Sequence, residues 1–539
     1  MSAPVYDVVG VGFGPANLAL CIALHESTAR TPDFDMCFLE QGPKFTWHPS
    51  LLLPGSQLQV SPLKDLATLR NPTSSYTFVN YLHKVDRLVD YINREEKVPS
   101  RREWSAYLAW AAQHMHAYVR YGRRVRDIVP ERSRSGVTCF CVISEDVASG
   151  ATSEVRARNV CIATGGAQQI PRVFQPLWEP CTGMDVSPLV HTSAFLPQMA
   201  RLGPMLREKA AAPGTPRLRL AVVGGGQSSA EVLCYLHSQF PDADLDMLVR
   251  ASALVPSDSS SFVNSAAFDP SSVSTFWESS ARDRRAQLAE FKRTNYSVVR
   301  NDLLSALYEI VYDQRIEFDD PYAAPKGVVR ILTNKELLHA DLLPTRQVRI
   351  DSRTVAGEQA AQSNVYDAVF LGTGFCRDAS SLPFVQSLAP HFPLLSRDGA
   401  AKLRETELAM DNQAAPTVDA NAQRGALRGI TRDYRLVAED TSEWHAGDGE
   451  PRLGVPPAVL QYLPGSRFSS DGSPPSSINT SDDSGYTSTN SSPGRTRSPA
   501  VYVFGCNEYT HGLSDSLMSI VAHRAGIVST ALLARMDMK

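Results

Sequence analysis

Short apolar runs separated by glycine-rich turns dominate much of the chain. The runs at 6–11 and 220–223 each lead into a glycine cluster, and a helix-forming stretch follows each cluster. Such runs, bounded by turns, are typical of buried strands in a parallel sheet. The pattern therefore predicts two strand–turn–helix units, one at 6–30 and one beginning near 220.

Other runs extend the same pattern. Five more apolar runs predict buried strands, at 36–40, 159–162, 245–249, 369–371 and 501–504. Alternation at 137–143 predicts a further strand. Two helices are expected: 102–120, with Trp104, Tyr107, Leu108 and Ala111 on one face, and about 514–535. The order of elements predicts an α/β fold with two Rossmann-like units, the second inserted into the first.

The two glycine clusters end their units with opposite charges. Gly12 and Gly14 follow the first strand, and the next strand closes on Glu40; Gly224–Gly226 follow the second, and its next strand closes on Arg250. Glycines let the backbone approach a pyrophosphate at a helix N-terminus. An acid there suits a free ribose 2′-hydroxyl, and an arginine suits a 2′-phosphate. The pair predicts one unphosphorylated dinucleotide and one NADPH, as in a flavoprotein that takes hydride from NADPH.

Two polar residues replace the third glycine of the turns. Asn17 does so in the first and Ser229 in the second, which weakens the case for close helix–strand packing without removing the phosphate cradle. The strand ends at 159–166 and 369–374 resemble the strands that return toward the cofactor in two-dinucleotide flavoproteins. We therefore expect an FAD-binding domain at 1–205 and 361–539, with an NADPH-binding domain at 206–360 between its parts.

Composition excludes several classes. The 539-residue chain is 43% hydrophobic, enough for large cores, and its net charge of −4 argues against nucleic acid. No apolar run approaches the length of a membrane span, so no stable membrane association is expected. Nine scattered cysteines without a C-x-x-C pair predict reduced thiols and no zinc site. With a strand starting near the N-terminus, we expect no signal peptide and a cytoplasmic protein.

Residues 469–498 differ in kind from the rest. They are almost all Ser, Thr, Pro, Gly, Asn and Asp, with Ile478 and Tyr486 as the bulky apolar groups. Such a stretch buries too little surface to offset its ordering entropy, which predicts a disordered Ser/Pro-rich insertion. A weaker, partly ordered insertion is expected from about 400.

Several stretches resemble the L-ornithine N-monooxygenase family, flavoproteins that hydroxylate a side-chain amine in siderophore synthesis. The stretches that carry the resemblance are Gly12–Ala19, Phe38–Glu40 with Trp47 and His48, Leu58–Thr68, Gly224–Glu231, Ser261–Asn264, Thr294–Tyr296 and Asn507–Asp515. Together they run from residue 5 to about 526, leaving out 400–498. The segments around Lys64 and Ser514 are specific to the family, whereas the glycine turns are not.

The resemblance implies roles for individual residues. FAD would be bound by Gly12, Gly14, Pro15, Asn17, Glu40, Gln41, Lys44, Trp47, His48, Gln59, Val125, His511, Gly512 and Leu513. NADPH would be bound by Gly225, Gly226, Gln227, Ser228, Arg250, Asn295, Tyr296 and Ser297. Ornithine would be bound by Lys64, Asn264, Ser265, Ala266, Ala267 and Ser514. No side chain is given a catalytic role and no metal is expected, because the flavin carries the chemistry with O₂; the resemblance also implies a homotetramer.

The residue chemistry is compatible with these roles. A zwitterionic amino acid needs a cation for its carboxylate and neutral acceptors for its ammonium, which Lys64, Asn264 and Ser514 can supply. Outside the family context, Lys64 is most simply a surface residue paired with Asp65. Asn264 is then a turn residue and Ser514 a helix cap. His511 is better explained as a hydrogen-bonded structural histidine than as an acid or base.

Four alternatives remain at this point. A lysine or other amine hydroxylase differs from an ornithine hydroxylase by as little as one methylene. A ketone monooxygenase is disfavoured because the F-x-G-x-x-x-H pattern is absent before His191. A disulfide reductase needs a redox cysteine pair near the flavin, and the spacing of the cysteines offers none. A non-catalytic nucleotide-binding protein would stay colourless when FAD is added.

Deleting 469–498 and joining the ends is expected to leave activity and melting temperature nearly unchanged. The segment lacks apolar anchors, and shortening a flexible loop changes its closure entropy little. Flavin content and thermal unfolding of the shortened protein test this. A loss of flavin or of folded protein would mean that the segment packs against the rest of the chain.

Overall fold

The computed structural model describes most of the chain. The described residues are 5–28, 34–96, 98–134, 136–320, 326–355, 360–411, 420–439 and 499–535. The segment 469–498 lies outside them, so the structure leaves its predicted disorder as a prediction.

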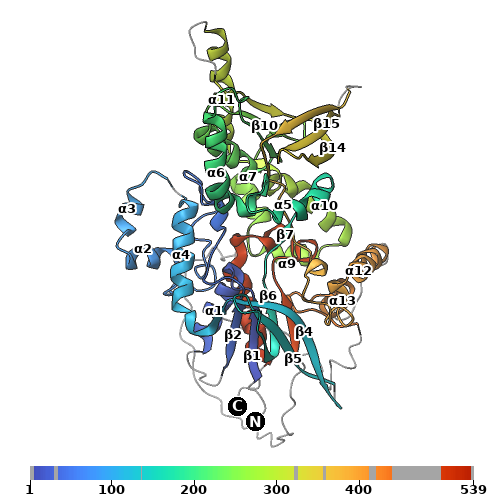
Figure 1. The fold of residues 1–539 in the computed structure, drawn as a ribbon. Helices are drawn as coiled ribbons and strands as arrows, with labels where there is room; N and C mark the ends of the chain where they lie inside the picture. Colours follow the sequence, from blue (N-terminus) through green and yellow to red (C-terminus); the bar gives the residue numbers. More distant parts are fainter. Residues whose placement is uncertain are drawn as a thin grey trace, which may run out of the picture.

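The first sheet contains the predicted N-terminal strands and the C-terminal one. Its strands follow the order β3-β2-β1-β6-β5-β4, with β19 also paired to β6. Their bounds are β1 Val5–Val11, β2 Met36–Glu40, β3 Val119–Tyr121, β4 Arg123–Ser133, β5 Gly136–Asp146, β6 Thr152–Ile162 and β19 Ala500–Val503. Strands β1, β2, β3, β6 and β19 are parallel, and β4 and β5 add an antiparallel edge. The sheet forms the lower part of Figure 1.

The second sheet is parallel throughout and follows the order β13-β10-β9-β17-β8. Its strands are β8 Leu189–His191, β9 Arg219–Val223, β10 Asp244–Leu248, β13 Val329–Leu332 and β17 Ala368–Leu371. Strands β8 and β17 of this sheet lie outside the limits predicted for the NADPH-binding domain, 206–360. The sheet therefore extends further along the chain than those limits, which stay a prediction. An antiparallel sheet of β14 Lys335–Leu342, β15 Val348–Thr354 and β16 Gln362–Tyr366 lies beside it.

The helices cover the sheets as the apolar pattern requires. On the first sheet lie α1 Pro15–Thr28, α4 Arg101–His114 and α16 Val521–Arg535; α2 Phe78–Lys84 packs beside α4, and α3 Leu88–Ile92 beside α2. The second sheet carries α5 Gln175–Thr182, α6 Phe195–Ala211, α7 Gln227–Gln239 and α11 Asn301–Asp319. Two predicted helices are too long: 102–120 ends at His114, and 514–535 begins as a regular helix only at Val521.

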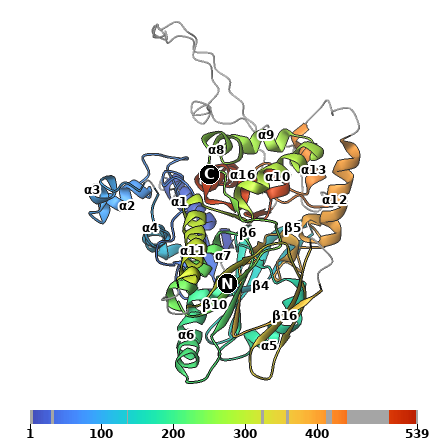
Figure 2. The ribbon, with the colours of Figure 1, turned by 90° about the horizontal axis from the view of Figure 1, so that it is seen from above.

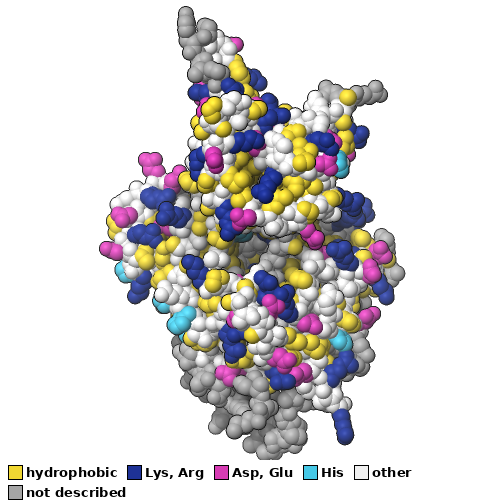
Figure 3. Space-filling model, in the orientation of Figure 1, with side chains coloured by type: hydrophobic (Ala, Val, Ile, Leu, Met, Phe, Trp, Pro, Cys, Tyr) yellow, Lys and Arg dark blue, Asp and Glu magenta, His cyan; other side chains and the backbone are white. Residues whose placement is uncertain are grey.

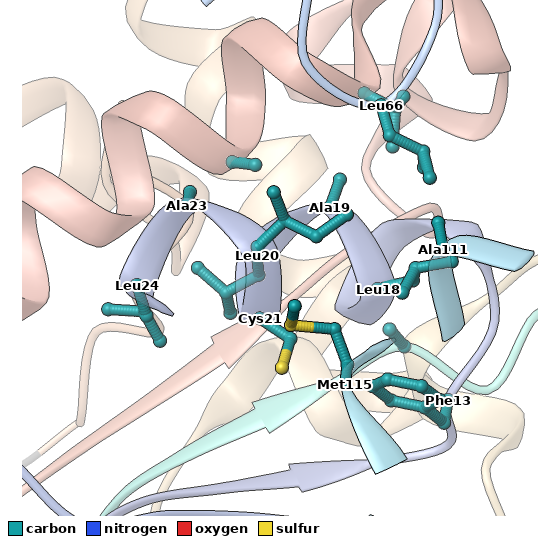
Figure 4. Packing of buried hydrophobic residues seen from close by; sticks show 14 of the residues in the cluster. Phe13, Leu18, Ala19, Leu20, Cys21, Ala23, Leu24, Leu66, Ala111 and Met115 are labelled. Atoms are coloured by element: carbon teal, nitrogen blue, oxygen red, sulfur yellow. The ribbon is translucent and has the colours of Figure 1, made fainter. Parts of the chain in front are cut away.

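Helix α1 is apolar on every side because it is covered on every side. Residues 18–24 are all fully buried, and Leu18, Leu20 and Leu24 appear among the packed side chains of Figure 4. A helix that is apolar all round belongs in a core rather than on a surface. It lies between the sheet, α4 and α16, and Met115 and Ala111 pack beside it. This core fixes the helix whose N-terminus faces the first glycine turn.

Three helices between β10 and β13 leave the second sheet and form a separate layer. They are α8 Ser261–Ala267, α9 Ser272–Glu278 and α10 Ala281–Asn295. Figure 2 shows α8, α9 and α10 on the side of the molecule that also carries α13 and α16. Helices α9 and α10 contact α15 Glu508–His511, and α10 also contacts α12 Arg397–Met410. Segments far apart in the sequence thus meet at this layer.

The region from about 400 contains ordered helices in its described parts. It contains α12 and α13 Ala420–Arg428, and a buried carboxylate anchors it. Glu407 accepts hydrogen bonds from Arg284 of α10 at 2.6 Å and from Arg428 at 2.7 Å. All three side chains are buried, and the Arg428 guanidinium also lies 4.4 Å from the ring centre of Trp277. The expectation of a partly ordered insertion stays a prediction; in its described part, buried ion pairs connect the two helices to α10.

Glu407→Ala is expected to lower the free energy of unfolding by about 3–5 kcal/mol, because it leaves two buried guanidinium groups without their counter-charge. Glu405→Ala is the matched control: Glu405 is exposed on the same helix, and its loss should change stability by less than about 0.5 kcal/mol. Urea denaturation of both variants measures the difference. Equal stability of the two would show that the buried triad does not anchor α12.

Candidate active site

The first glycine turn is pressed against the end of strand β6. Gly12 has a φ of +79°, and a Cβ at this position would lie 2.8 Å from the carbonyl oxygen of Ala163. A Cβ at Gly14, by contrast, would meet nothing within 4 Å. Glycine is therefore required at the first position for packing, and at the second it leaves the backbone open to a ligand. Helix α1 begins at Pro15, so its free N–H groups face this open side.

Asn17 ties this turn to β6. Its side chain is fully buried, and Nδ2 donates to the carbonyl oxygens of Gly12 at 2.7 Å and of Cys161 at 3.2 Å. A polar residue in place of the third glycine weakened the argument from sequence for close helix–strand packing. The structure nevertheless holds the turn close to the strand, because the Asn17 amide bridges the two.

Glu40 ends β2 beside the same turn, as predicted. Its Oε2 accepts the N–H of Phe13 at 2.8 Å, and its Oε1 accepts that of Gly42 at 2.7 Å. A carboxylate has about four acceptor positions, so both oxygens can still accept hydroxyl groups. Of the other predicted FAD residues, Gln41, Lys44, His48 and Gln59 are exposed, Trp47 is half-buried and Val125 is buried in β4.

The second turn repeats the construction. Gly224 has a φ of +127°, and a Cβ there would lie 2.5 Å from the carbonyl oxygen of Gly372, which follows β17. Ser229, fully buried, donates to that same carbonyl at 3.2 Å. Ser229 thus does for the second turn what Asn17 does for the first. Both turns are fixed to a strand end by a polar side chain at the same position.

The structure brings several of the predicted NADPH residues together. A Cβ on Gly226 would lie 3.6 Å from the Cα of Ser297, which itself has a left-handed φ of +58°. A Cβ on Gly225 would lie 2.9 Å from Cγ1 of Val249. The next residue, Arg250, therefore begins beside the turn, and its side chain is exposed to solvent. Gln227 is engaged within the protein, since its Oε1 accepts the N–H of Arg300 at 2.9 Å. Ser228 follows Gln227, and Asn295 and Tyr296 precede Ser297; all three residues are half-buried.

Lys64 does not pair with Asp65. The Asp65 carboxylate is buried and accepts backbone N–H groups from Ala67, Thr68 and Phe78 at 2.6–2.9 Å. Lys64 points the other way, and its Nζ donates to the carbonyl oxygen of Phe268 at 3.0 Å. The surface-pair interpretation is therefore wrong, because Asp65 is already used to fix its own loop.

Phe268 directly follows helix α8, which carries Asn264, Ser265, Ala266 and Ala267. Lys64 thus reaches the end of the helix that holds four of the predicted ornithine residues. Asn264 is half-buried, and its Nδ2 donates to the carbonyl oxygen of Ser259 at 2.9 Å. Burial lowers the pKa of Lys64, and the charge of Asp269 acts in the opposite direction.

The C-terminal segment is held rigidly against α9. Asp515 is fully buried and accepts the N–H of Asn507 at 2.7 Å and a guanidinium N–H of Arg524 at 2.8 Å. Gly512 has a φ of +88°, and a Cβ there would come within 3.4 Å of the Phe276 ring. Leu513 and Ser514 are buried in the turn that follows.

His511 is a structural histidine in this structure, as the sequence suggested. It is fully buried, stacks on Tyr434 with ring centres 4.1 Å apart, and its Nδ1 bonds the Thr510 hydroxyl at 2.8 Å. Burial lowers its pKa to about 4, so the ring is neutral near pH 7. Its predicted contact with FAD stays a prediction.

Two connections between the units were missed from the sequence. Arg101 of α4 pairs with Glu231 of α7 at 2.8 Å, and the Tyr296 hydroxyl donates to the carboxylate of Glu508. Burial and Glu508 together raise the pKa of Tyr296 to about 12. Both connections join residues more than a hundred positions apart, so local sequence patterns could not reveal them. Among the described residues, no group of three or more His, Cys, Asp or Glu side chains could hold a metal ion.

Comparison with known proteins agrees with this geometry. Residues 4–377 match the family model of L-lysine 6-monooxygenase/L-ornithine 5-monooxygenase. An L-ornithine N(5)-monooxygenase from Mycosarcoma maydis is 41% identical over 99% of this chain and 85% of its own. The structure resembles ornithine hydroxylase PvdA from Pseudomonas aeruginosa, with a TM-score of 0.73, 30% identity and coverage of 99% and 100% of the two chains. It also resembles the ornithine N-hydroxylase KtzI of Kutzneria sp. 744, described with reduced FAD, NADP⁺ and L-ornithine, with a TM-score of 0.71, 28% identity and the same coverage.

Acid should destabilise the protein partly through His511. Its pKa is about 4 when folded, against an ordinary 6.5, so the unfolded chain takes up this proton first as the pH falls. The resulting loss of stability develops between about pH 6.5 and pH 4 and is on the order of 3 kcal/mol. His511→Gln should lose less stability than the native protein over this interval. His83→Gln, at an exposed position, should retain the full dependence. Denaturant midpoints from pH 7 to pH 4.5 measure this, and parallel curves for all three proteins would contradict it.

Proposed function

Because the chain belongs to the L-lysine 6-monooxygenase/L-ornithine 5-monooxygenase family, we propose that it hydroxylates the side-chain amine of L-ornithine. The product is N(5)-hydroxy-L-ornithine, and the enzyme is a flavin-dependent monooxygenase that uses FAD, NADPH and O₂. We infer that this product enters hydroxamate siderophore biosynthesis, as the sequence resemblance implied.

The residues of the two turns fit the two cofactors. Gly14 leaves room at the N-terminus of α1 for the FAD pyrophosphate, and Glu40 ends the adjacent strand where a ribose hydroxyl would lie. Gly226 and the N-terminus of α7 offer the same for NADPH, and Arg250 extends where a 2′-phosphate would need a cation. The opposite charges at the two strand ends give each turn its own dinucleotide.

The flavin, once reduced by NADPH, supplies the activation of O₂, and the protein supplies position and exclusion of water. The turn of Gly512 to Ser514 is buried, and the contacts of the next residue, Asp515, with Asn507 and Arg524 hold it in place. His511 directly precedes this turn, and its buried ring is neutral near pH 7, so it neither donates nor accepts a proton there.

The observation that best supports an amino-acid substrate is the environment of Lys64. Its ammonium group is half-buried, has no carboxylate partner in Asp65, and meets the end of α8 through a single carbonyl. An incoming α-carboxylate would replace that neutral acceptor with a charged one, which forms the stronger hydrogen bond. Asn264 and Ser514 would then receive the α-ammonium, leaving the side-chain amine to extend toward the flavin.

L-lysine is the second candidate, since the family includes lysine hydroxylases. One methylene changes binding in a shaped site by about 1–3 kcal/mol, so the two substrates can be separated by rate. The names of the relatives favour ornithine.

A homotetramer is proposed from the family resemblance. A cytoplasmic location is supported by nine cysteines that are all unpaired, as expected in a reducing compartment. Among the described residues, no helix combines the length and apolar character that crossing a membrane requires. On the face shown in Figure 3, cationic and anionic side chains are interspersed, in keeping with the net charge of −4.

Product analysis tests the function directly. The purified protein is incubated with NADPH, O₂ and L-ornithine, L-lysine or a diamine, and hydroxylamine product is quantified beside NADPH consumption. We expect the highest kcat/KM with ornithine. Equal or higher kcat/KM with lysine would transfer the assignment to the second candidate, and NADPH consumption without product from any amine would contradict N-hydroxylation.

Lys64→Ala should raise the KM for ornithine by the equivalent of about 2 kcal/mol or more, because the substrate carboxylate loses its counter-charge. Flavin reduction by NADPH should remain nearly intact, since this contact lies away from the hydride path. Binding lost equally in ground and transition states appears mainly in KM. Lys84→Ala, at an exposed position of α2, is the control and should leave KM unchanged. An unchanged KM in Lys64→Ala would remove Lys64 from the site, and slowed reduction would move it toward the nicotinamide.

A further inference from the structure

Arg377 lies where the connections between the two sheets cross. It follows the short strand β18 Phe375–Cys376, which pairs antiparallel with β7 Ala167–Gln168. These two strands continue the chain beyond the ends of β17 and β6, the strands that support the two glycine turns. The Cγ of Arg377 lies 2.8 Å from the position of a Cβ on Gly166, so its stem rests on the turn that leaves β6. The side chain therefore starts between the two nucleotide turns.

Two other partly buried arginines around the second turn have acidic partners, whereas Arg250 is exposed to solvent. Arg101 pairs with Glu231 at 2.8 Å, and the Arg300 Nε donates to Asp302 at 2.9 Å. Arg377 is half-buried and has no hydrogen-bond or ion-pair partner in the part of the chain that the structure describes. The adjacent Asp378 is already used, because its Oδ1 accepts the N–H of Ser380 at 3.0 Å and the hydroxyl at 2.9 Å.

A partly exposed guanidinium with no acceptor in the described part of the protein has its N–H donors free for a ligand. Its planar set of N–H donors matches the oxygens of a phosphate, which can accept two parallel hydrogen bonds. The ligands that this enzyme binds are dinucleotides with a diphosphate at the centre. The shared chemistry that would satisfy Arg377 is thus a diphosphate.

We propose that Arg377 binds the diphosphate of a bound dinucleotide and that this dinucleotide is NADP(H). The inference rests on the proposed function, because it takes the two cofactors as given. Arg377 is then a cofactor-positioning residue at the junction, additional to the residues predicted from the sequence.

The position of the preceding turn favours NADP(H) over FAD. Arg377 comes five residues after Gly372, whose carbonyl oxygen lies 2.5 Å from the Cβ position of Gly224 in the second turn. The charge of Arg377 opposes burial and Glu508, which raise the pKa of Tyr296; it also adds to burial and Arg101 in lowering the pKa of His48, so this charge does not separate NADP(H) from FAD. Tyr296 precedes Ser297, which packs on Gly226. Arg377 also contacts Gly166, which follows the strand that supports the first glycine turn, so FAD is the other possible source of the diphosphate.

Equilibrium binding separates the two sources without relying on turnover. NADP⁺ and NAD⁺ are titrated into the oxidised, FAD-loaded protein carrying Arg377→Ala, Arg377→Lys, Arg250→Ala or Arg172→Ala. Arg172 is exposed after β7 and serves as the control. FAD retention and melting temperature are measured on the same samples.

We expect Arg377→Ala to weaken NADP⁺ and NAD⁺ alike, on the order of tenfold or more, because both carry the diphosphate. Arg250→Ala should weaken NADP⁺ selectively, since only NADP⁺ carries the 2′-phosphate. Arg377→Lys should restore part of the affinity by keeping the charge without the planar donor set. Arg172→Ala should bind as the native protein does.

Weaker FAD retention with unchanged nicotinamide binding would support a diphosphate ligand and identify it as FAD. Unchanged affinity for all three dinucleotides would overturn the proposal, as would a lower melting temperature with unchanged affinities, which would make Arg377 purely structural. If the native protein yielded no hydroxylated amine, the proposed function would fail, whereas the titrations would still report on Arg377.

Discussion

The arrangement of the molecule depends on the close approach between each glycine turn and the end of the neighbouring strand. At Gly12 and Gly224 a Cβ would lie only 2.8 Å and 2.5 Å from a carbonyl oxygen of the next strand end. Such distances exclude every side chain, so the turn sits directly on the strand that leads out of the sheet. Asn17 and Ser229 then bond across the same gap. The backbone of each cofactor turn is thereby fixed relative to the connection that leads to the other sheet.

That connection explains how two similar units make one active site. The chains leaving β6 and β17 pair as β7 and β18, so the first turn, the second turn and Arg377 are linked through a few residues of backbone. The layer of α8, α9 and α10 is added from elsewhere: these helices belong to the second unit in sequence, but α9 and α10 contact α15 of the C-terminal segment. The ion pairs of Glu407 with Arg284 and Arg428 connect α10 to α12. The Trp277 ring contacts the Arg428 guanidinium, and its centre lies 5.0 Å from that of the His511 ring. The ordered part of the insertion is in this way connected to the site it surrounds.

The sequence predicted what is local. The two turns, the acid at Glu40 and the arginine at 250 could be found because strand, turn and charge follow one another within about thirty residues. The direction of the Lys64 side chain could not be predicted, because the Asp65 carboxylate already accepts backbone N–H groups, among them that of Phe78. The contact that anchors α12 could not be predicted either, because Arg284 lies more than a hundred residues away in the sequence. The family resemblance supplied the site residues of the C-terminal segment, which the residue pattern alone explains as caps and turns.

We propose that one chain holds two different dinucleotides, FAD on the turn beside Glu40 and NADP(H) on the turn beside Arg250. The most direct measurement is the dinucleotide content of the protein after anaerobic reduction with NADPH and removal of free ligand. Chromatography of the released cofactors should give one flavin and one NADP⁺ per chain. A single dinucleotide per chain, or retention of NAD⁺ from NADH equal to that of NADP⁺, would contradict the account.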